Sequence, residues 1–292
     1  MKTKKHSNDK KSIRKKKKKT KVIGIHGLSD SKGSKYVDAG DKDPYKNKGL
    51  YDFFSRIKIL GKNYKKNFLF WITYCICITI LSIKYGNQSS IFKNIFMGFI
   101  SVLLVMSTGY MAHYLSHSIC FRKLYEDKFE SKNLSTENNE KIKSIIDYTI
   151  DFHDKIHHNS NINKKWSNIL IEAIQNMLLE GGLWIIFSVI VGLGIQINGE
   201  IYKLNIATMF LWVILYATVH LINYRIVHPN SHISHHMDYY KNLSLTDMFD
   251  LIFNTKYDKR KIQDLHHFII NTVLITIILY FSKDICEVFT NF

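Results

Sequence analysis

Four long apolar segments dominate the pattern of hydrophobic and polar residues along the chain. They cover residues 68–83, 95–112, 181–197 and 204–222. His220 interrupts the last of these runs. Each run is close to the length that a helix needs to cross about 30 Å of hydrocarbon at about 1.5 Å per residue. A fifth run, 268–281, is shorter and is expected to span, re-enter or lie at the interface. The pattern predicts an all-α integral membrane protein with about four transmembrane helices.

Positive charge is concentrated at the N-terminal end. The 292 residues include 41 Lys and Arg against 24 Asp and Glu, and residues 1–66 hold 22 of the former and 6 of the latter. Like charges at this density oppose packing, so residues 1–50 are expected to form a basic, disordered tail. The positive-inside rule keeps this tail in the cytosol and places residues 113–180 and 220–265 on the same side. We expect the tail to lie near anionic lipid, and nucleic-acid binding is the alternative.

Ten of the 14 histidines fall into three short windows, all on the expected cytosolic side. The windows are His113-Tyr-Leu-Ser-His117, then His153-Asp-Lys-Ile-His157-His158, and a third that runs from His220 through His228 to His232-Ile-Ser-His235-His236. Residues three or four apart share one face of a helix, so each window can present two or three imidazoles to one point. Neutral imidazole is a good ligand for iron, zinc and copper. One ion takes three or four protein ligands, so the windows predict a helical cap that holds two metal ions.

Two classes of protein are compatible with these windows. The first is a metalloenzyme whose chemistry needs two ions. The second is a non-catalytic membrane protein with a structural zinc site and a basic tail that binds lipid or nucleic acid. A structural zinc ion takes four ligands, and ten clustered histidines exceed that number. The other four histidines are expected to be surface or interface residues: His6, His26, His266 and His267.

The three windows, their order and their position between pairs of spans resemble the membrane-bound fatty acid hydroxylase and sterol desaturase superfamily. The resemblance continues after His236, where Asn242 follows six positions later. The next stretch, Phe249-Asp250-Leu-Ile-Phe253-Asn-Thr255, is similar to the family's Trp-Asp-x-x-Phe-Gly-Thr element, with Phe and Asn in place of Trp and Gly. The resemblance covers roughly residues 95–257. Two departures stand out: the middle window has one extra residue before its His pair, and Tyr224 occupies the place of a second histidine after His220.

The resemblance implies a non-heme di-iron oxygenase that uses O2 to hydroxylate or desaturate a lipid, either a sterol or a fatty acyl chain. It implies two iron ions, with zinc as an adventitious occupant, and a separate electron donor such as a b-type cytochrome and its reductase. It also implies an endoplasmic-reticulum-type membrane. The metal ligands that it implies are His113, His117, His153, His157, His158, His232, His235 and His236, and further candidates are His220 and His228. Candidates to orient the imidazoles are Asp151, Asp154, Asn242 and Asp250, and for the three aspartates a place in a solvated loop or at a helix cap is the alternative.

The chain is thus expected to have four parts. Residues 1–50 form the tail, 51–94 the first span and its turn, 95–257 the hydroxylase domain, and 258–292 a C-terminal apolar helix. Residues 169–180 are expected to form an amphipathic helix that leads into the third span. On that helix, Glu172 and Glu180 are expected to face the aqueous boundary, and a role as functional carboxylates is the alternative.

Overall fold

The computed structural model describes residues 51–130, 134–153, 157–158, 166–197, 199–259 and 261–282. The predicted tail, Asp154 and the residues after 282 lie outside the described residues. The helices, in chain order, are α1 (Tyr51–Lys66), α2 (Phe68–Tyr85), α3 (Ile91–Ser118), α4 (Phe121–Lys128), α5 (Thr136–Thr149), α6 (Trp166–Met177), η3 (Leu178–Gly182), α7 (Leu183–Val191), α8 (Ile206–Thr218), η4 (Val219–Asn223), α9 (Tyr224–Val227), α10 (Asn230–Met237), α11 (Met248–Ile252), η5 (His266–Phe268) and α12 (Ile269–Phe281). One hairpin joins β1 (Gly194–Ile197) to β2 (Glu200–Lys203).

Four helical segments are long and apolar enough to cross a membrane, which confirms the predicted fold class. They cover residues 68–85, 91–118, 167–191 and 206–227. The last two are composite. A kink in η3, where the backbone of Glu180 and Gly181 leaves the helical region, separates α6 from α7, and a π-helical turn, η4, lies between α8 and α9. A π-turn adds a residue to a helix and occurs often at functional sites. The kink and the π-turn therefore mark positions where the helical register changes, one near the middle of the third span and one towards the end of the fourth.

The third apolar run differs from its prediction at both ends. The span begins near residue 167 and ends at Val191, whereas the predicted run covered 181–197. Gly192 ends the helix with a left-handed backbone, φ 63°. Residues 194–197 then form β1, which pairs antiparallel with β2 across a turn at Gly199, φ 83°. Glycine adopts such positive φ values without steric cost, so two glycines replace the last helical turns by a hairpin.

Polar caps fix where two of the spans begin. The Ser90 hydroxyl accepts a hydrogen bond from the backbone N–H of Lys93 at 3.2 Å, at the start of α3. The Asn205 side chain accepts one from Thr208 N–H at 3.0 Å, at the start of α8. Each cap satisfies a backbone donor that a helix N-terminus leaves without an intrahelical partner.

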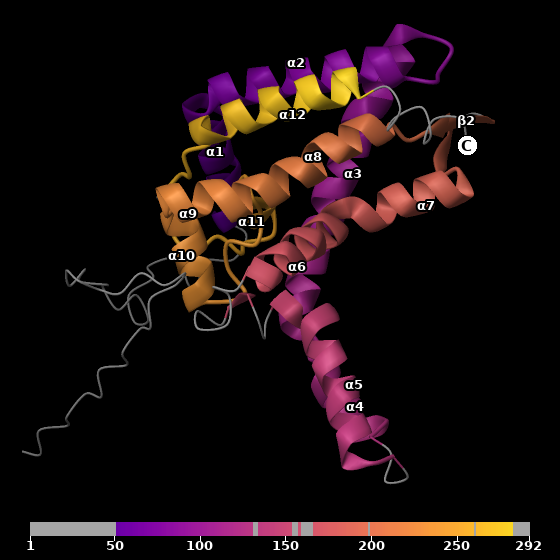
Figure 1. Ribbon diagram of the computed structural model, residues 1–292. Helices are drawn as coiled ribbons and strands as arrows, with labels where there is room; N and C mark the ends of the chain where they lie inside the picture. The colour runs from indigo at the N-terminus through magenta and orange to yellow at the C-terminus, as the bar shows by residue number, and fades with distance from the viewer. Residues whose placement is uncertain are drawn as a thin grey trace, which may run out of the picture.

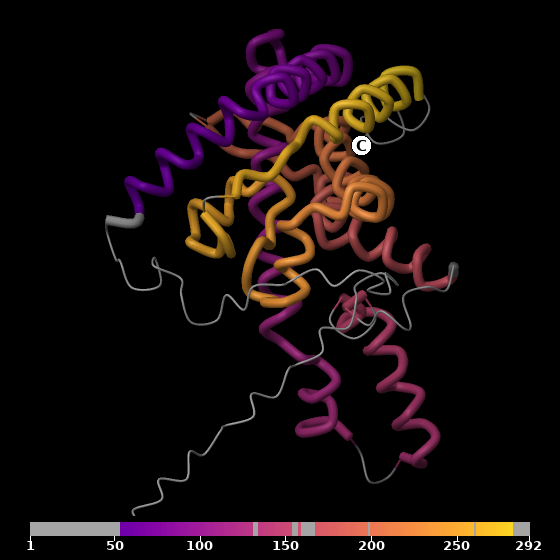
Figure 2. Tube along the Cα trace, turned by 90° about the vertical axis from the view of Figure 1, so that its left-hand side faces the viewer, coloured from indigo at the N-terminus to yellow at the C-terminus, as the bar shows by residue number. Residues whose placement is uncertain are grey.

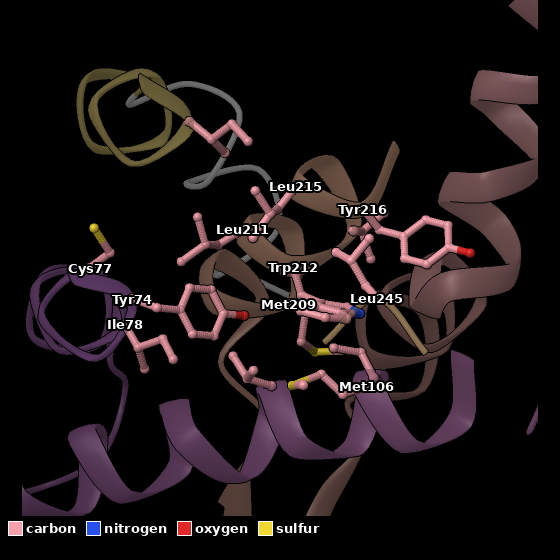
Figure 3. Close-up of a cluster of buried hydrophobic side chains, with 14 of the residues drawn as sticks. Tyr74, Cys77, Ile78, Met106, Met209, Leu211, Trp212, Leu215, Tyr216 and Leu245 are labelled. Atoms are coloured by element: carbon pink, nitrogen blue, oxygen red, sulfur yellow. The ribbon is translucent and has the colours of Figure 1, made fainter. Parts of the chain in front are cut away.

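Helix α8 is the centre of the bundle. It packs against α2, α3, α6 and α12, and two thirds of its most apolar window is buried, 67%. Figure 3 shows side chains of this core. They come from α2 (Tyr74, Cys77, Ile78), α3 (Met106), α8 (Met209, Leu211, Trp212, Leu215) and the loop after α10 (Leu245). Tyr216 lies at the edge of this cluster, and its hydroxyl points away from the apolar side chains (Figure 3).

Helix α12, the fifth apolar run, lies beside α2 and also packs against α8 (Figure 1). The hydroxyl of Tyr85 donates to the backbone oxygens of Leu279 and Tyr280, at 2.8 and 3.0 Å. These bonds join the ends of α2 and α12. Helix α12 is thus an integral part of the helical bundle.

The two ends of the bundle carry different structures. The β-hairpin and the turn between α2 and α3 lie at one end, and α1, α9, α10 and α11 lie at the other (Figure 1). Helices α4 and α5 pack against each other and project from the bundle beyond the C-terminal end of α3 (Figures 1 and 2). Every histidine window belongs to the end that carries α9 and α10, or to segments that lead into it.

Candidate metal centre

Nine of the ten predicted histidine ligands converge in two adjoining groups. The first histidine group contains His113 and His117 from the end of α3, together with His153 and His235. The second histidine group is built around His157, and its other members are His158, His220, His232 and His236. Within each set of ring nitrogens that could share one ion, all atoms lie within 4.8 Å of one another.

Two imidazoles of the first group, those of His153 and His235, have Nε2 atoms close to the Nε2 of His113. The Nε2 of His113 lies 2.9 Å from that of His153 and 3.2 Å from that of His235. The Nδ1 of His113 donates to the backbone oxygen of Leu243, and the Nδ1 of His235 donates to that of Lys241, both at 2.9 Å. A carbonyl oxygen only accepts, so Nδ1 carries the proton in both rings and Nε2 carries a lone pair. Facing lone pairs repel one another, and a cation between them turns this repulsion into coordination.

The second group divides into two overlapping sets that share His157. One set adds His220 and His232, and the other adds His158 and His236. The Nε2 atoms of His232 and His236 are 3.2 Å apart. The Nε2 of His158 lies 3.3 Å from that of His153, so the two histidine groups touch. The arrangement has room for two ions as neighbours rather than at separate ends of the protein.

A buried carboxylate supports the second group. Glu172 on α6 is 2% exposed, and its Oε1 lies 3.0 Å from His157 Nδ1 and 3.3 Å from His220 Nδ1. A carboxylate that accepts from Nδ1 orients the ring and leaves Nε2 free to bind a metal ion. The expectation that Glu172 faces the aqueous boundary was therefore wrong. It orients two imidazoles that lie far apart in the sequence.

A signal for this residue was present in the sequence. Asn168, Glu172, Asn176 and Glu180 follow one another at intervals of four along an otherwise apolar helix, and all four are buried. Residues four apart lie on one face, so the helix carries a polar stripe that faces the protein interior. The amide nitrogen of Asn176 lies 3.3 Å from His220 Nδ1, next to Glu172.

Glu180, at the far end of this stripe, is also buried, so its expected position at the aqueous boundary was wrong too. It lies in η3, and its side chain is hydrogen-bonded to Tyr216. The carboxylate packs so closely against Gly109 of α3 that a Cβ there would lie 2.2 Å from Oε2. The next residue, Gly181, has φ 124°, which a residue with a side chain rarely adopts.

Tyr216 connects the two histidine groups. Its ring stacks on that of His220, with centroids 5.6 Å apart and an interplanar angle of 9°. Its hydroxyl lies 3.5 Å from His113 Nδ1. Glu180 thus holds a tyrosine that touches one imidazole of each group.

Two of the predicted orienting residues act through the backbone. The Asp250 carboxylate accepts from Leu243 N–H and Ser244 N–H at 2.8 Å each, and from the hydroxyl of Thr255 at 2.7 Å. Asn242, with φ 52°, donates to Ser231 O and accepts from Tyr257 N–H, at 3.0 Å each. The two residues fix the turn 241–243, whose carbonyl groups bind the rings of His113 and His235. Neither side chain has a hydrogen bond to an imidazole among the described contacts.

Asp151 has a different role, since it accepts from Phe121 N–H at 3.0 Å and Arg122 N–H at 2.8 Å. It caps α4 rather than binding an imidazole. Asp154 is the fourth candidate of this kind and lies outside the described residues.

His228 lies outside both histidine groups. It ends α9 with φ 49° and lines a cleft of about 520 Å³ on the side of α10 that carries Ser231 and Ser234. Tyr224, in the place of the family's second histidine, lies with its ring 4.7 Å from that of His232. Its hydroxyl accepts from Gln263 Nε2 at 3.1 Å, so Tyr224 forms part of the wall of the second group.

The imidazoles at this centre are in the form that binds metal. Burial, followed by the neighbouring histidines, holds the pKa of His153 and His158 well below the usual range. Burial and then His117 do the same to the pKa of His235. These rings are therefore neutral near pH 7, which is the state of a metal ligand. Nitrogen-rich donor sets of three or four imidazoles suit iron, zinc and copper.

No protein-family model, curated protein or solved structure matches this chain. The helical fold, the apolar spans and the buried histidine groups are compatible with a membrane protein that binds metal. The resemblance to the hydroxylase and desaturase superfamily rests on the histidine windows and the element that follows them.

Proposed function

We propose that this chain is an integral membrane, non-heme di-iron oxygenase that hydroxylates or desaturates a lipid. The observation that carries the proposal is the pair of adjoining, buried imidazole groups, with Nε2 atoms that face one another at the end of apolar helices. One structural zinc ion would need no more than four of these nine rings. A sterol or a fatty acyl chain is the proposed substrate, because the apolar helices lead directly to the histidine groups.

The donor set fits two iron ions. The first would be held by His113, His117, His153 and His235, and the second by members of the second histidine group. When bound, the iron pair would supply the activation of O2 that attack on an unactivated C–H bond requires. The same hydrogen abstraction begins hydroxylation and desaturation, so both outcomes remain within the proposal.

The chain's own residues prepare the site in three ways. The carbonyl groups of the turn 241–243 accept hydrogen bonds from Nδ1 of His113 and His235 and so fix their tautomers. The Glu172 carboxylate lies beside Nδ1 of His157 and His220 and orients these two rings. The low exposure of the rings excludes bulk water, which protects a reactive oxidant from side reactions. The apolar side chains of α3 and α8 would hold the lipid chain beside the ring nitrogens.

The remaining parts of the proposal follow from the resemblance. The membrane would be of the endoplasmic-reticulum type, and the N-terminus and the histidine groups would lie in the cytosol. Electrons would come from a separate donor, such as a b-type cytochrome and its reductase, which would approach from that side. We do not propose nucleic acid as a partner.

Metal analysis of the full chain, purified in mild detergent from iron-supplemented cells, tests the proposal. We expect roughly two iron ions per chain, a number that falls when His157 or His235 is replaced by Ala. The matched control is His266→Ala, because His266 lies outside both groups, is exposed and is bound to Asp264.

A search for lipid products completes the test. Cells that express the protein should accumulate a lipid that has gained one oxygen atom or lost two hydrogen atoms, and the His235→Ala variant should not produce it. About one zinc ion per chain and no iron after reconstitution would favour the structural-zinc alternative. A folded protein that binds no metal under any condition would contradict both interpretations.

A further inference from the structure

Helix α1 is anchored to the protein along one face and at its C-terminal end, where the Tyr64 hydroxyl lies 3.2 Å from Met248 Sδ and Lys66 donates to Ile262 O at 2.9 Å. The guanidinium of Arg56 donates to the backbone oxygens of Leu251 and Ile252 at the end of α11. The buried amide of Asn63 donates to Asp247 Oδ2 at 3.4 Å. These two residues are seven apart and therefore lie on the same side of the helix.

A second face of α1 is apolar and exposed. Phe53, Ile57 and Tyr64 lie on one side of the helix, at intervals of four and seven, and are 42%, 45% and 36% exposed. Phe54 lies next to this row and is 71% exposed. Single exposed apolar residues are ordinary, but a continuous row along one helix marks a surface that meets an apolar phase.

The third face of α1 is basic. Lys58, Lys62 and Lys65 are exposed and follow one another at intervals of four and three. The helix contains five basic residues and a single acidic one, Asp52. An exposed basic row beside an exposed apolar row is the composition of helices that lie in the interface of a bilayer.

The connection to the first span places α1 at the membrane surface. Only Asn67 separates the end of α1 from α2, and this buried residue is fixed through Gln263 O and Leu265 N–H, at 3.0 and 2.9 Å. One residue covers less than about 4 Å, so Lys66 cannot lie far from the start of the span. In Figure 2, α2 is seen nearly end-on while α1 runs across the view, so α1 extends at a steep angle to the span.

We propose that α1 lies in the bilayer interface and that its Lys58, Lys62 and Lys65 face binds anionic phospholipid. Phe53 and Ile57, with the exposed edge of Tyr64, enter the boundary between headgroups and acyl chains, and the ammonium groups meet the lipid phosphates and carboxylates. Charge complementarity selects an anionic leaflet, and the short link to α2 keeps the helix at that depth. The proposal uses the membrane position of the spans and is independent of the oxygenase activity, so metal content does not enter its test.

The contact between α1 and α11 also links the proposed lipid-binding helix to the candidate metal centre. Arg56 binds the end of α11, and α11 contains Asp250, which holds the turn that orients His113. Lipid binding at α1 therefore stabilises the same segment that positions the first histidine group.

Hydrogen exchange of the α1 amides, measured by mass spectrometry on the full chain in nanodiscs, tests the proposal. Nanodiscs of phosphatidylcholine alone are compared with nanodiscs that also contain phosphatidylserine. We expect exchange of α1 to be slower by at least about tenfold with phosphatidylserine, since each Lys near an anionic surface contributes roughly fivefold in affinity. Replacing Lys58, Lys62 and Lys65 by Gln should abolish the difference.

The control replaces three exposed lysines of the α4–α5 hairpin by Gln: Lys123, Lys128 and Lys141. This variant has the same net charge as the test variant and should keep the phosphatidylserine effect. Equal exchange of α1 in both nanodiscs, for the unmodified chain, would overturn the proposal whatever the variants do. A slowing of exchange by an RNA oligonucleotide but not by phosphatidylserine would overturn it as well, in favour of nucleic acid.

Discussion

Replacing Glu172 by Ala is expected to affect the second histidine group and not the first. The carboxylate orients His157 and His220, and both rings belong to the second group. In the first group, the rings of His113 and His235 are oriented by backbone carbonyl oxygens, which the substitution does not touch. The variant should therefore weaken one metal site and leave the other intact.

The structure sets the size of the effect. Loss of one orienting partner of a metal-binding histidine weakens metal affinity about 10- to 100-fold. Glu172 orients two rings of the same group, so we expect the upper end, about 100-fold or about 2.7 kcal/mol. The Glu172→Gln variant keeps one oxygen that accepts a hydrogen bond, and we expect an intermediate loss of about tenfold.

Titration of the metal-free protein with Co²⁺ in detergent, in competition with a chelator, measures both sites by absorption. We expect two binding steps in the unmodified chain and a selective shift of one step in Glu172→Ala. Glu200→Gln is the matched control, because Glu200 is an exposed carboxylate on β2, paired with Lys93 at the other end of the bundle. An equal shift of both steps, or no shift, would refute the assignment of Glu172 to one group.

Three further predictions concern stability in detergent, measured by thermal unfolding. Asp250→Ala leaves two buried N–H groups and one hydroxyl without their acceptor and should lower the free energy of unfolding by about 3 kcal/mol; a loss under about 1 kcal/mol would contradict its role in the turn. Gly109→Ala forces a Cβ to within 2.2 Å of Glu180 Oε2 and should cost about 1–3 kcal/mol, while Gly61→Ala, where nothing lies within 4 Å, should not destabilise. Burial lowers the pKa of three imidazoles of the centre, those of His153, His158 and His235. Below about pH 6.5, the ordinary pKa of histidine, the unfolded metal-free chain therefore binds more protons than the folded chain. Stability of the metal-free protein should thus be retained above that pH and fall below it, by up to about 1.4 kcal/mol per pH unit for each ring, and a flat profile between pH 7.5 and 5.5 would exclude this.

The parts of the fold that the sequence predicts are those with a local cause. A span corresponds to one continuous apolar run of the sequence. All four predicted runs lie in helices that are long enough to cross a membrane, apart from the last residues of the third run and the first two of the fourth. The histidine spacings are also local, and nine of the ten residues converge. His228 follows the same spacing as its neighbours, but α9 ends at Val227 and His228 turns away with a left-handed backbone.

The parts that escaped prediction depend on which helix becomes a neighbour. For Glu172 and Glu180 the aqueous boundary was the favoured position and a functional role the alternative. A carboxylate inside an apolar helix is costly unless it has a partner. The partners of Glu172 are His157 in the second histidine window and His220 on η4, and the partner of Glu180 is Tyr216 on α8. All three are distant from the carboxylates along the chain. Only the spacing of four that Glu172 shares with Asn176 indicated a common interior face. Such a polar stripe in an apolar helix is a better sign of a buried site than either carboxylate alone.

The residues after the last histidine window hold the loop that orients two of the imidazoles. Asn242 and Asp250 attract attention in the sequence as groups that could touch a metal ligand, yet their side chains bind backbone groups of the loop. What they supply is the position of two carbonyl oxygens, and those oxygens decide which nitrogen of His113 and His235 carries the proton. A substitution there changes the ligand tautomer without removing a ligand. The residues that set the chemistry of this centre thus include several that never meet the ion, and Asp250 and Asn242 belong with the histidines as one functional unit.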